Sequence, residues 1–66
     1  MKIALSPLER ILRENGAERI GAGAVEELRK EVESYAKAVA EASIAVCKHA
    51  GRKTIRKEDV KLVVRL

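Results

Sequence analysis

Basic side chains gather in one short stretch near the end of this 66-residue chain, KHAGRKTIRKEDV. The stretch contains Lys48, Arg52, Lys53, Arg56 and Lys57. The last quarter of the chain, residues 51–66, carries six basic and two acidic residues, a surplus equal to the net charge of +4 for the whole chain. A concentration of one sign of charge attracts ligands of the opposite sign. The stretch therefore predicts a surface that faces a polyanion.

The chain has too few suitable residues to form a catalytic site or a metal site. Cys47 is expected on the buried side of a helix without an adjacent base, where it acts as a small apolar filler. Ser34 and Ser43 have no histidine within helical reach, so a hydrolase is not supported. One cysteine and one histidine cannot supply the four ligands of a structural zinc site, and a single cysteine forms no intramolecular disulfide. We expect no enzyme, no cofactor and no metal.

Two helices are predicted in the first fifty residues. Ser6, followed by Pro7 and by Glu9 three positions after it, predicts a first helix with Ser6 as its N-cap and a capping box. Gly16 is expected to end this helix in a left-handed conformation. The run from Ala24 to Ala50 contains neither Pro nor Gly and predicts one long second helix, whose start after Gly23 lacks a good cap.

A third helix is predicted at the end of the chain, from Lys57 to Leu66, after Gly51 has ended the second. Two acids fall in its first turn, where the helix dipole favours negative charge. Val60, Val63 and Val64 are expected to form its core face. A second face, formed by Asp59, Leu62 and Leu66, is apolar apart from the acid and is not needed for that core.

The long second helix predicts a dimer. Its apolar side chains recur at gaps of three and four residues over its whole length, at Val25, Leu28, Val32, Tyr35, Val39, Ala42 and Val46. A helix of about 27 residues is about 40 Å long, whereas a compact domain of this size is only about 28 Å across. One short helix on each side cannot cover such a stripe, but a second copy can. No signal peptide or membrane-spanning run is recognised, so an intracellular protein is expected.

Three motifs give the sequence a close resemblance to the archaeal histones. They are GAERI at residues 16–20, HAGRKTI at residues 49–55 and EDV at residues 58–60. The resemblance extends without gaps over essentially the whole chain, so we expect one histone-fold domain over residues 1–66, without tails. It implies an all-α histone fold (short helix, loop, long central helix, loop, short helix) in an intertwined homodimer.

The resemblance also implies roles for individual residues. The expected DNA contacts are Arg10, Arg13, Arg19, Lys53, Thr54 and Arg56. Arg19 resembles the arginine that enters the minor groove, and Lys53 and Thr54 resemble phosphate contacts. Arg52 and Asp59 resemble an ion pair that braces the second loop. Stacking of one dimer on the next is expected to use Val46, His49, Asp59 and Leu62.

The function implied is sequence-nonspecific binding, wrapping and compaction of duplex DNA by a chromatin protein of the cytoplasmic nucleoid. The expected partners are double-stranded DNA and a second histone chain, either another copy or a paralogous histone. Two alternatives stay open: a histone-fold component of a transcription or repair assembly, and an unrelated helical dimerisation module such as an antitoxin-like repressor. The basic segments contain no Asn or Gln and the chain has one aromatic residue, so it lacks the usual means of reading base edges or stacking on bases.

Overall fold

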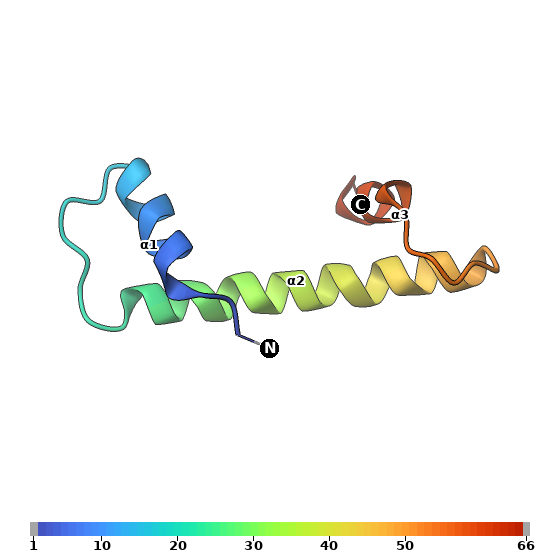
Figure 1. The fold of residues 1–66 in the computed structure, drawn as a ribbon, viewed down its shortest axis with the longest axis horizontal. Helices are drawn as coiled ribbons and strands as arrows, with labels where there is room; N and C mark the ends of the chain where they lie inside the picture. Colours follow the sequence, from blue (N-terminus) through green and yellow to red (C-terminus); the bar gives the residue numbers. More distant parts are fainter. Residues whose placement is uncertain (1, 66) are drawn as a thin grey trace. The chain divides into compact units, whose positions relative to one another are not determined.

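The computed structural model describes residues 2–65, which form three α-helices in the order shown in Figure 1. Helix α1 is Leu5–Glu14, α2 is Ala24–His49 and α3 is Lys57–Arg65. The predicted all-α chain with a short, a long and a short helix is confirmed, and Leu66, the predicted last residue of α3, lies outside the described residues. Within residues 2–65 no helix is both long enough and apolar enough to span a membrane.

The chain divides into two compact units, residues 1–34 and residues 35–66. In the first unit, α1 begins one residue earlier than Ser6. The N-cap is Ala4, in an extended conformation, and no side chain caps it. The expected capping box on Ser6 is therefore wrong. The first four N–H groups of a helix have no acceptor within the helix, so Pro7 is tolerated in the first turn and does not require Ser6 to be the cap.

The end of α1 follows the sequence prediction. Gly16 has a φ of 104°, a conformation that strains residues with a Cβ atom. The N–H of Gly16 donates to the carbonyl of Arg13 at 3.0 Å, and the N–H of Ala17 donates to that of Leu12 at 3.0 Å. This pair of bonds is a Schellman motif, which satisfies two of the last carbonyl groups of α1. The first loop, residues 15–23, starts from this fixed turn.

Two further contacts order the first unit. The N–H of Ile3 donates to the carboxylate of Glu33, which fastens the segment before α1 to α2. Gly23, at a φ of 82°, allows the turn before α2, and its carbonyl accepts the N–H of Glu27 at 2.9 Å. Helix α2 thus begins at Ala24, the predicted residue. Gly23 before it has no side chain that could cap the helix.

In the second unit, Gly51 repeats the arrangement seen at Gly16. It has a φ of 74°, its N–H donates to Lys48, and the N–H of Arg52 donates to the carbonyl of Cys47. This second Schellman motif ends α2 and opens the second loop, residues 50–56. The loop leads into α3, where the expected core face is wrong for the single chain: Val60 and Val64 are 38% and 51% exposed, although Val63 is half-buried.

Apolar side chains are only sparsely covered. Among residues 2–65 the fully buried hydrophobic side chains are Leu8 and Cys47. The predicted stripe of α2 is half-buried for most of its length, but Tyr35 is 65% exposed. A domain of this size without disulfides or a metal needs another source of stability. The incompletely covered stripe is therefore available for association with a second chain.

Candidate nucleic-acid interface

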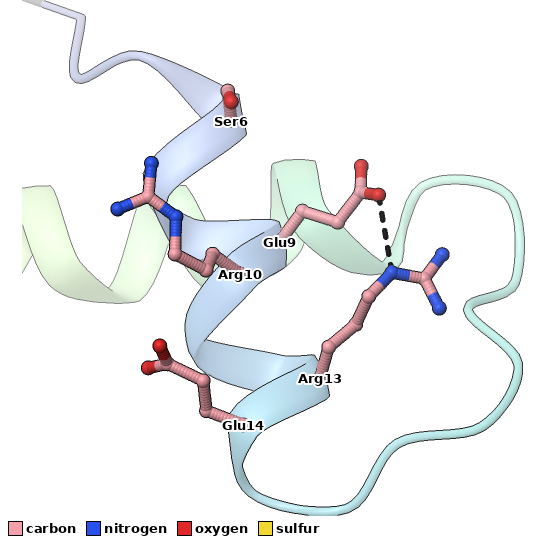
Figure 2. A pocket seen from close by; sticks show the side chains of 5 residues that line it. All are labelled: Ser6, Glu9, Arg10, Arg13 and Glu14. Atoms are coloured by element: carbon pink, nitrogen blue, oxygen red, sulfur yellow. Dashed lines mark hydrogen bonds and ion pairs between the residues drawn. The ribbon is translucent and has the colours of Figure 1, made fainter.

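The first group of candidate residues lies on α1. Arg10 and Arg13 line a shallow hollow of about 460 Å³, the α1 hollow, together with Ser6, Glu9 and Glu14. In Figure 2 the guanidinium groups of Arg10 and Arg13 extend in different directions, with Arg13 beside Glu9. Nε of Arg13 lies 3.4 Å from Oε2 of Glu9. No ion pair to Arg10 is found among residues 2–65, so the two arginines differ in how free they are to bind an anion.

Arg19 lies in the first loop, in a part without regular structure, and its side chain is exposed. The half-buried Ile20 follows it directly. A guanidinium group that is exposed next to an anchored apolar residue can reach a ligand without first losing a protein contact. The location of Arg19 is thus compatible with its expected role, which stays a prediction.

The second loop is closed by an ion pair between Arg52 and Asp59. Nη1 of Arg52 donates to Oδ2 of Asp59 at 2.9 Å, and Nη2 donates to Oδ1 at 2.7 Å. Two parallel bonds between a guanidinium group and a carboxylate fix the orientation of both side chains. Nη1 also donates to the carbonyl of Thr54 at 3.2 Å. Arg52 therefore joins the loop to α3, and its donors are directed at the protein.

Asp59 also fixes the start of α3. Its Oδ2 accepts the backbone N–H of Arg56, the residue just before the helix, at 2.9 Å. A side chain in the first turn that accepts the N–H of the capping residue provides half of a capping box. The bonds from the Arg52 guanidinium and then from the Arg56 N–H lower the pKa of Asp59 to about 2, against the opposing effect of burial. Asp59 is 3% exposed and stays ionised at neutral pH.

Cys47 contributes to the second loop in a way that the sequence did not predict. Its Sγ lies 3.4 Å from the carbonyl oxygen of Arg52 and 3.3 Å from that of Thr54. A thiol is a weak donor, and one S–H shared between two carbonyl groups adds to the Arg52 bond that Thr54 already accepts. The expected role as a purely apolar filler is therefore incomplete. Helical periodicity locates Cys47 on the buried side but does not show that the loop folds back over it.

The remaining candidates of the second loop are on the surface. Lys53, Thr54 and Arg56 are all exposed. The loop thus holds Arg52 inward and leaves the charges of Lys53 and Arg56 in solvent, on a backbone fixed by Cys47, Arg52 and Asp59. A preordered loop loses less conformational entropy when it binds. Chemically, this arrangement offers an anion two positive charges and the hydroxyl group of Thr54. Within residues 2–65 no group of three or more His, Cys, Asp or Glu side chains could hold a metal ion.

The residues expected to stack dimers differ in exposure. His49 is exposed, Val46 is half-buried and Leu62 is 50% exposed. Leu62 also lines a second hollow of about 370 Å³ on α3, with Glu58, Lys61 and Arg65. Asp59, by contrast, is buried and already accepts three hydrogen bonds. A carboxylate has about four acceptor sites, so Asp59 has little capacity left for a histidine of another dimer.

Comparisons with known proteins agree with the helical fold and the loop motifs. The family model described as histone-like transcription factor (CBF/NF-Y) and archaeal histone matches residues 1–64. A component of the archaeal histone HAN1 of Thermococcus zilligii is 38% identical over 64 residues, which cover 97% of this chain and 96% of that protein. The probable archaeal histone 3 of Methanocaldococcus jannaschii is 36% identical over 64 residues, with the same coverage. The resemblance seen in the sequence is confirmed, and the chain belongs to the family of histone-like transcription factors and archaeal histones.

Proposed function

We propose that this protein is a histone-fold dimer that binds, wraps and compacts duplex DNA without reading its sequence. Family membership supports DNA binding and packaging in general. The observation that carries the finer proposal is the second loop, which exposes Lys53, Thr54 and Arg56 on a backbone braced by the Arg52–Asp59 pair. Binding through phosphates is electrostatic and independent of sequence, which suits a protein associated with the chromosome.

The proposed interface contains both loops and α1. Lys53 and Thr54 contact phosphates, Arg56 adds charge beside them, and Arg10 and Arg13 face the DNA backbone from α1. Arg19 enters the minor groove, where its contribution also depends on groove width. In a dimer each of these contacts occurs twice. The partner chain is a second copy or a paralogous histone. The HAN1 relative is named as one component of its histone, which makes the second option worth testing.

The test measures how salt weakens binding to mixed-sequence duplexes. Each lost phosphate contact reduces the salt slope by about 0.9, so Lys53→Ala in a homodimer is expected to reduce it by about 1.8 and to weaken all sequences alike. Lys30→Ala is the matched control, because Lys30 lies on α2 in an exposed pair with Glu27 and is outside the proposed interface. A marked change in sequence preference would indicate a specific repressor. A parent protein without affinity for duplex DNA would favour a component of a larger assembly that acts through protein contacts.

We further propose that dimers stack on DNA through Val46, His49 and Leu62, with Asp59 holding the backbone of that surface. The exposure of His49 and Leu62 supports this surface, whereas the burial of Asp59 argues against a strong histidine–carboxylate contact between dimers. Nuclease digestion of the complex is expected to protect DNA in steps of one dimer's length. His49→Asp should shorten protection to a single step, because it introduces a negative charge into the proposed stacking surface. An unchanged ladder would remove His49 from the stacking surface.

A further inference from the structure

The α1 hollow carries no net charge, although it contains two of the proposed DNA contacts. Its charged lining consists of Arg10, Arg13, Glu9 and Glu14, two groups of each sign. Phosphate binding favours an uncompensated positive surface. The two glutamates therefore oppose the function proposed for the two arginines, and their positions decide which arginine is affected.

Glu9 and Glu14 are not equivalent. Glu9 precedes Arg13 by four residues on α1, and Oε2 of Glu9 lies 3.4 Å from Nε of Arg13. An acid four residues before a base is the more favourable order for a pair on a helix. Glu14 follows Arg10 by four residues, the less favourable order, and residues 2–65 contain no ion pair between them. In Figure 2 Glu9 is directed at Arg13, whereas the side chain of Arg10 extends in the opposite direction, away from that pair.

We propose that Glu9 competes with DNA phosphate for Arg13 and so lowers the affinity of α1 for DNA. The inference rests on the proposed function, and it assigns to Glu9 a role in setting the strength of that binding. Arg10 would act as the constant phosphate contact of α1, with the Ser6 hydroxyl lining the same hollow as an additional donor. Arg13 would bind phosphate only in the fraction of molecules in which it has left Glu9.

Because the Glu9–Arg13 pair is exposed, its effect on the affinity for DNA is expected to be modest. The side chains of Arg13 and Glu9 are 53% and 49% exposed, and exposed ion pairs are weak and screened by salt. A phosphate of the duplex can therefore displace Glu9, at a cost in affinity. From the usual range for exposed pairs four residues apart on a helix, each chain loses roughly twofold in affinity. A homodimer contains the pair twice, so the effect on the dimer is larger than the effect on one chain.

The experiment is a double-mutant cycle with Glu9→Gln and Arg13→Ala, measured as binding of the full-length protein to a mixed-sequence duplex across a range of salt. We expect Glu9→Gln to tighten binding at low salt by roughly three- to fivefold per dimer and to steepen the salt slope by up to about 1.8. In the Arg13→Ala background the same substitution should give less than about a twofold gain. Glu14→Gln is the matched control, because it removes the same charge from the same hollow.

Each outcome separates the inference from the proposed function. Equal gains from Glu9→Gln in the parent and in the Arg13→Ala background would show general repulsion and overturn the inference. An equal gain from Glu14→Gln would do the same. If Arg13→Ala binds the duplex as tightly as the parent does, Arg13 is not part of the interface. This result would overturn the inference, while DNA binding would stand. A parent that binds no duplex would instead overturn the proposed function. A misfolded variant is not expected to bind DNA more tightly than the parent. Unchanged helical circular dichroism of Glu9→Gln would show that the variant is folded.

Discussion

Among single residues, Asp59 at the start of α3 is the acceptor that holds the second loop. Its carboxylate joins the Arg52 side chain to the N–H of Arg56, so one group closes the loop and starts α3. Arg52 is its counterpart: the hydrogen bond to Asp59 raises the pKa of Arg52. These two charges serve the loop's conformation, and Lys53 and Arg56 are left exposed to solvent.

The lowered pKa of Asp59 predicts how stability depends on pH. The pKa is about 2 in the folded chain and about 3.9 in an unfolded one. The stabilisation is therefore complete above about pH 4 and is lost as the pH falls toward about 2. We expect Asp59→Asn to melt at a lower temperature than the parent at neutral pH. The difference should stay constant down to about pH 4 and shrink below it.

Thermal melts of both proteins from neutral to acidic pH give the measurement. Glu58→Gln is the matched control, because Glu58 is the neighbouring acid of the first turn of α3 and is exposed. Other carboxylates also titrate in acid, but they do so in parent and variant alike, so the difference isolates Asp59. A difference that persists unchanged to pH 2 would contradict the assignment.

At the scale of the elements, the stops were predictable and one start was not. Gly16 and Gly51 end α1 and α2 as expected, because a left-handed residue after a helix is strongly selective for glycine. The first helical residue of α1 was predicted to be Pro7, after an N-cap at Ser6, whereas the helix begins at Leu5 after an N-cap at Ala4. Serine favours the capping position, but Pro7 is equally compatible with the first and the third helical position, so the sequence does not distinguish the two starts.

In the candidate site, one contact was predictable from the sequence and others were not. The motifs located Arg52 and Asp59 and related them as a pair, and the structure brings them together. Periodicity assigned Asp59 to a second face of α3 together with Leu62, outside the expected core, whereas its bonds to Arg52 allow it to be buried. The contacts of Cys47 with two loop carbonyl groups depend on how the backbone turns after Gly51, and residue spacing carries no such information.

The turn at Gly51 supports a prediction about the second loop. Its φ of 74° strains any residue with a Cβ atom, although no atom lies within 4 Å of where that Cβ would be. Gly51→Ala is therefore expected to destabilise the protein by about 1 kcal/mol through backbone strain alone. Gly21→Ala is the matched control, because its surroundings are also open and its φ is not positive.

The control should have the opposite sign. Alanine at residue 21 restricts the unfolded chain and is expected to stabilise the protein by roughly 0.4–1 kcal/mol. Urea unfolding of both variants measures the two changes in the free energy of unfolding at equal protein concentration. Equal effects of the two substitutions would mean that the left-handed turn at Gly51 is not required, and the loop geometry derived from it would have to be revised.

At the scale of the whole molecule, the exposed apolar residues indicate association. Large hydrophobic side chains with at least 38% exposure occur on all three helices and in the second loop: Ile11, Tyr35, Ile44, Ile55, Val60, Leu62 and Val64. Scattered exposed apolar residues are common in monomers, but here they accompany a core with two fully buried hydrophobic side chains among residues 2–65. We therefore expect a second chain to supply the free energy that a larger domain gains inside one chain.

Folding and dimerisation are therefore expected to be one process. If only the dimer is folded, its melting temperature rises with protein concentration, because dilution favours the unfolded monomers. We expect such a rise over about a hundredfold range of concentration, followed by calorimetry or circular dichroism. Tyr35 supplies the variant: it is 65% exposed in the single chain, at mid-length of α2, and a partner would cover its ring.

Tyr35→Lys is expected to lower the melting temperature strongly, because burial of one aromatic ring contributes about 1.5–3 kcal/mol and a homodimer contains two rings. Tyr35→Phe is the matched control; it keeps the ring and should melt close to the parent. The same melts test whether a dimer forms and whether Tyr35 lies in its contact. A parent whose melting temperature is independent of concentration, with a monomer mass in solution, would show that the exposed stripe of α2 does not hold a partner. A Lys variant as stable as the Phe variant would place the dimer contact elsewhere on the chain.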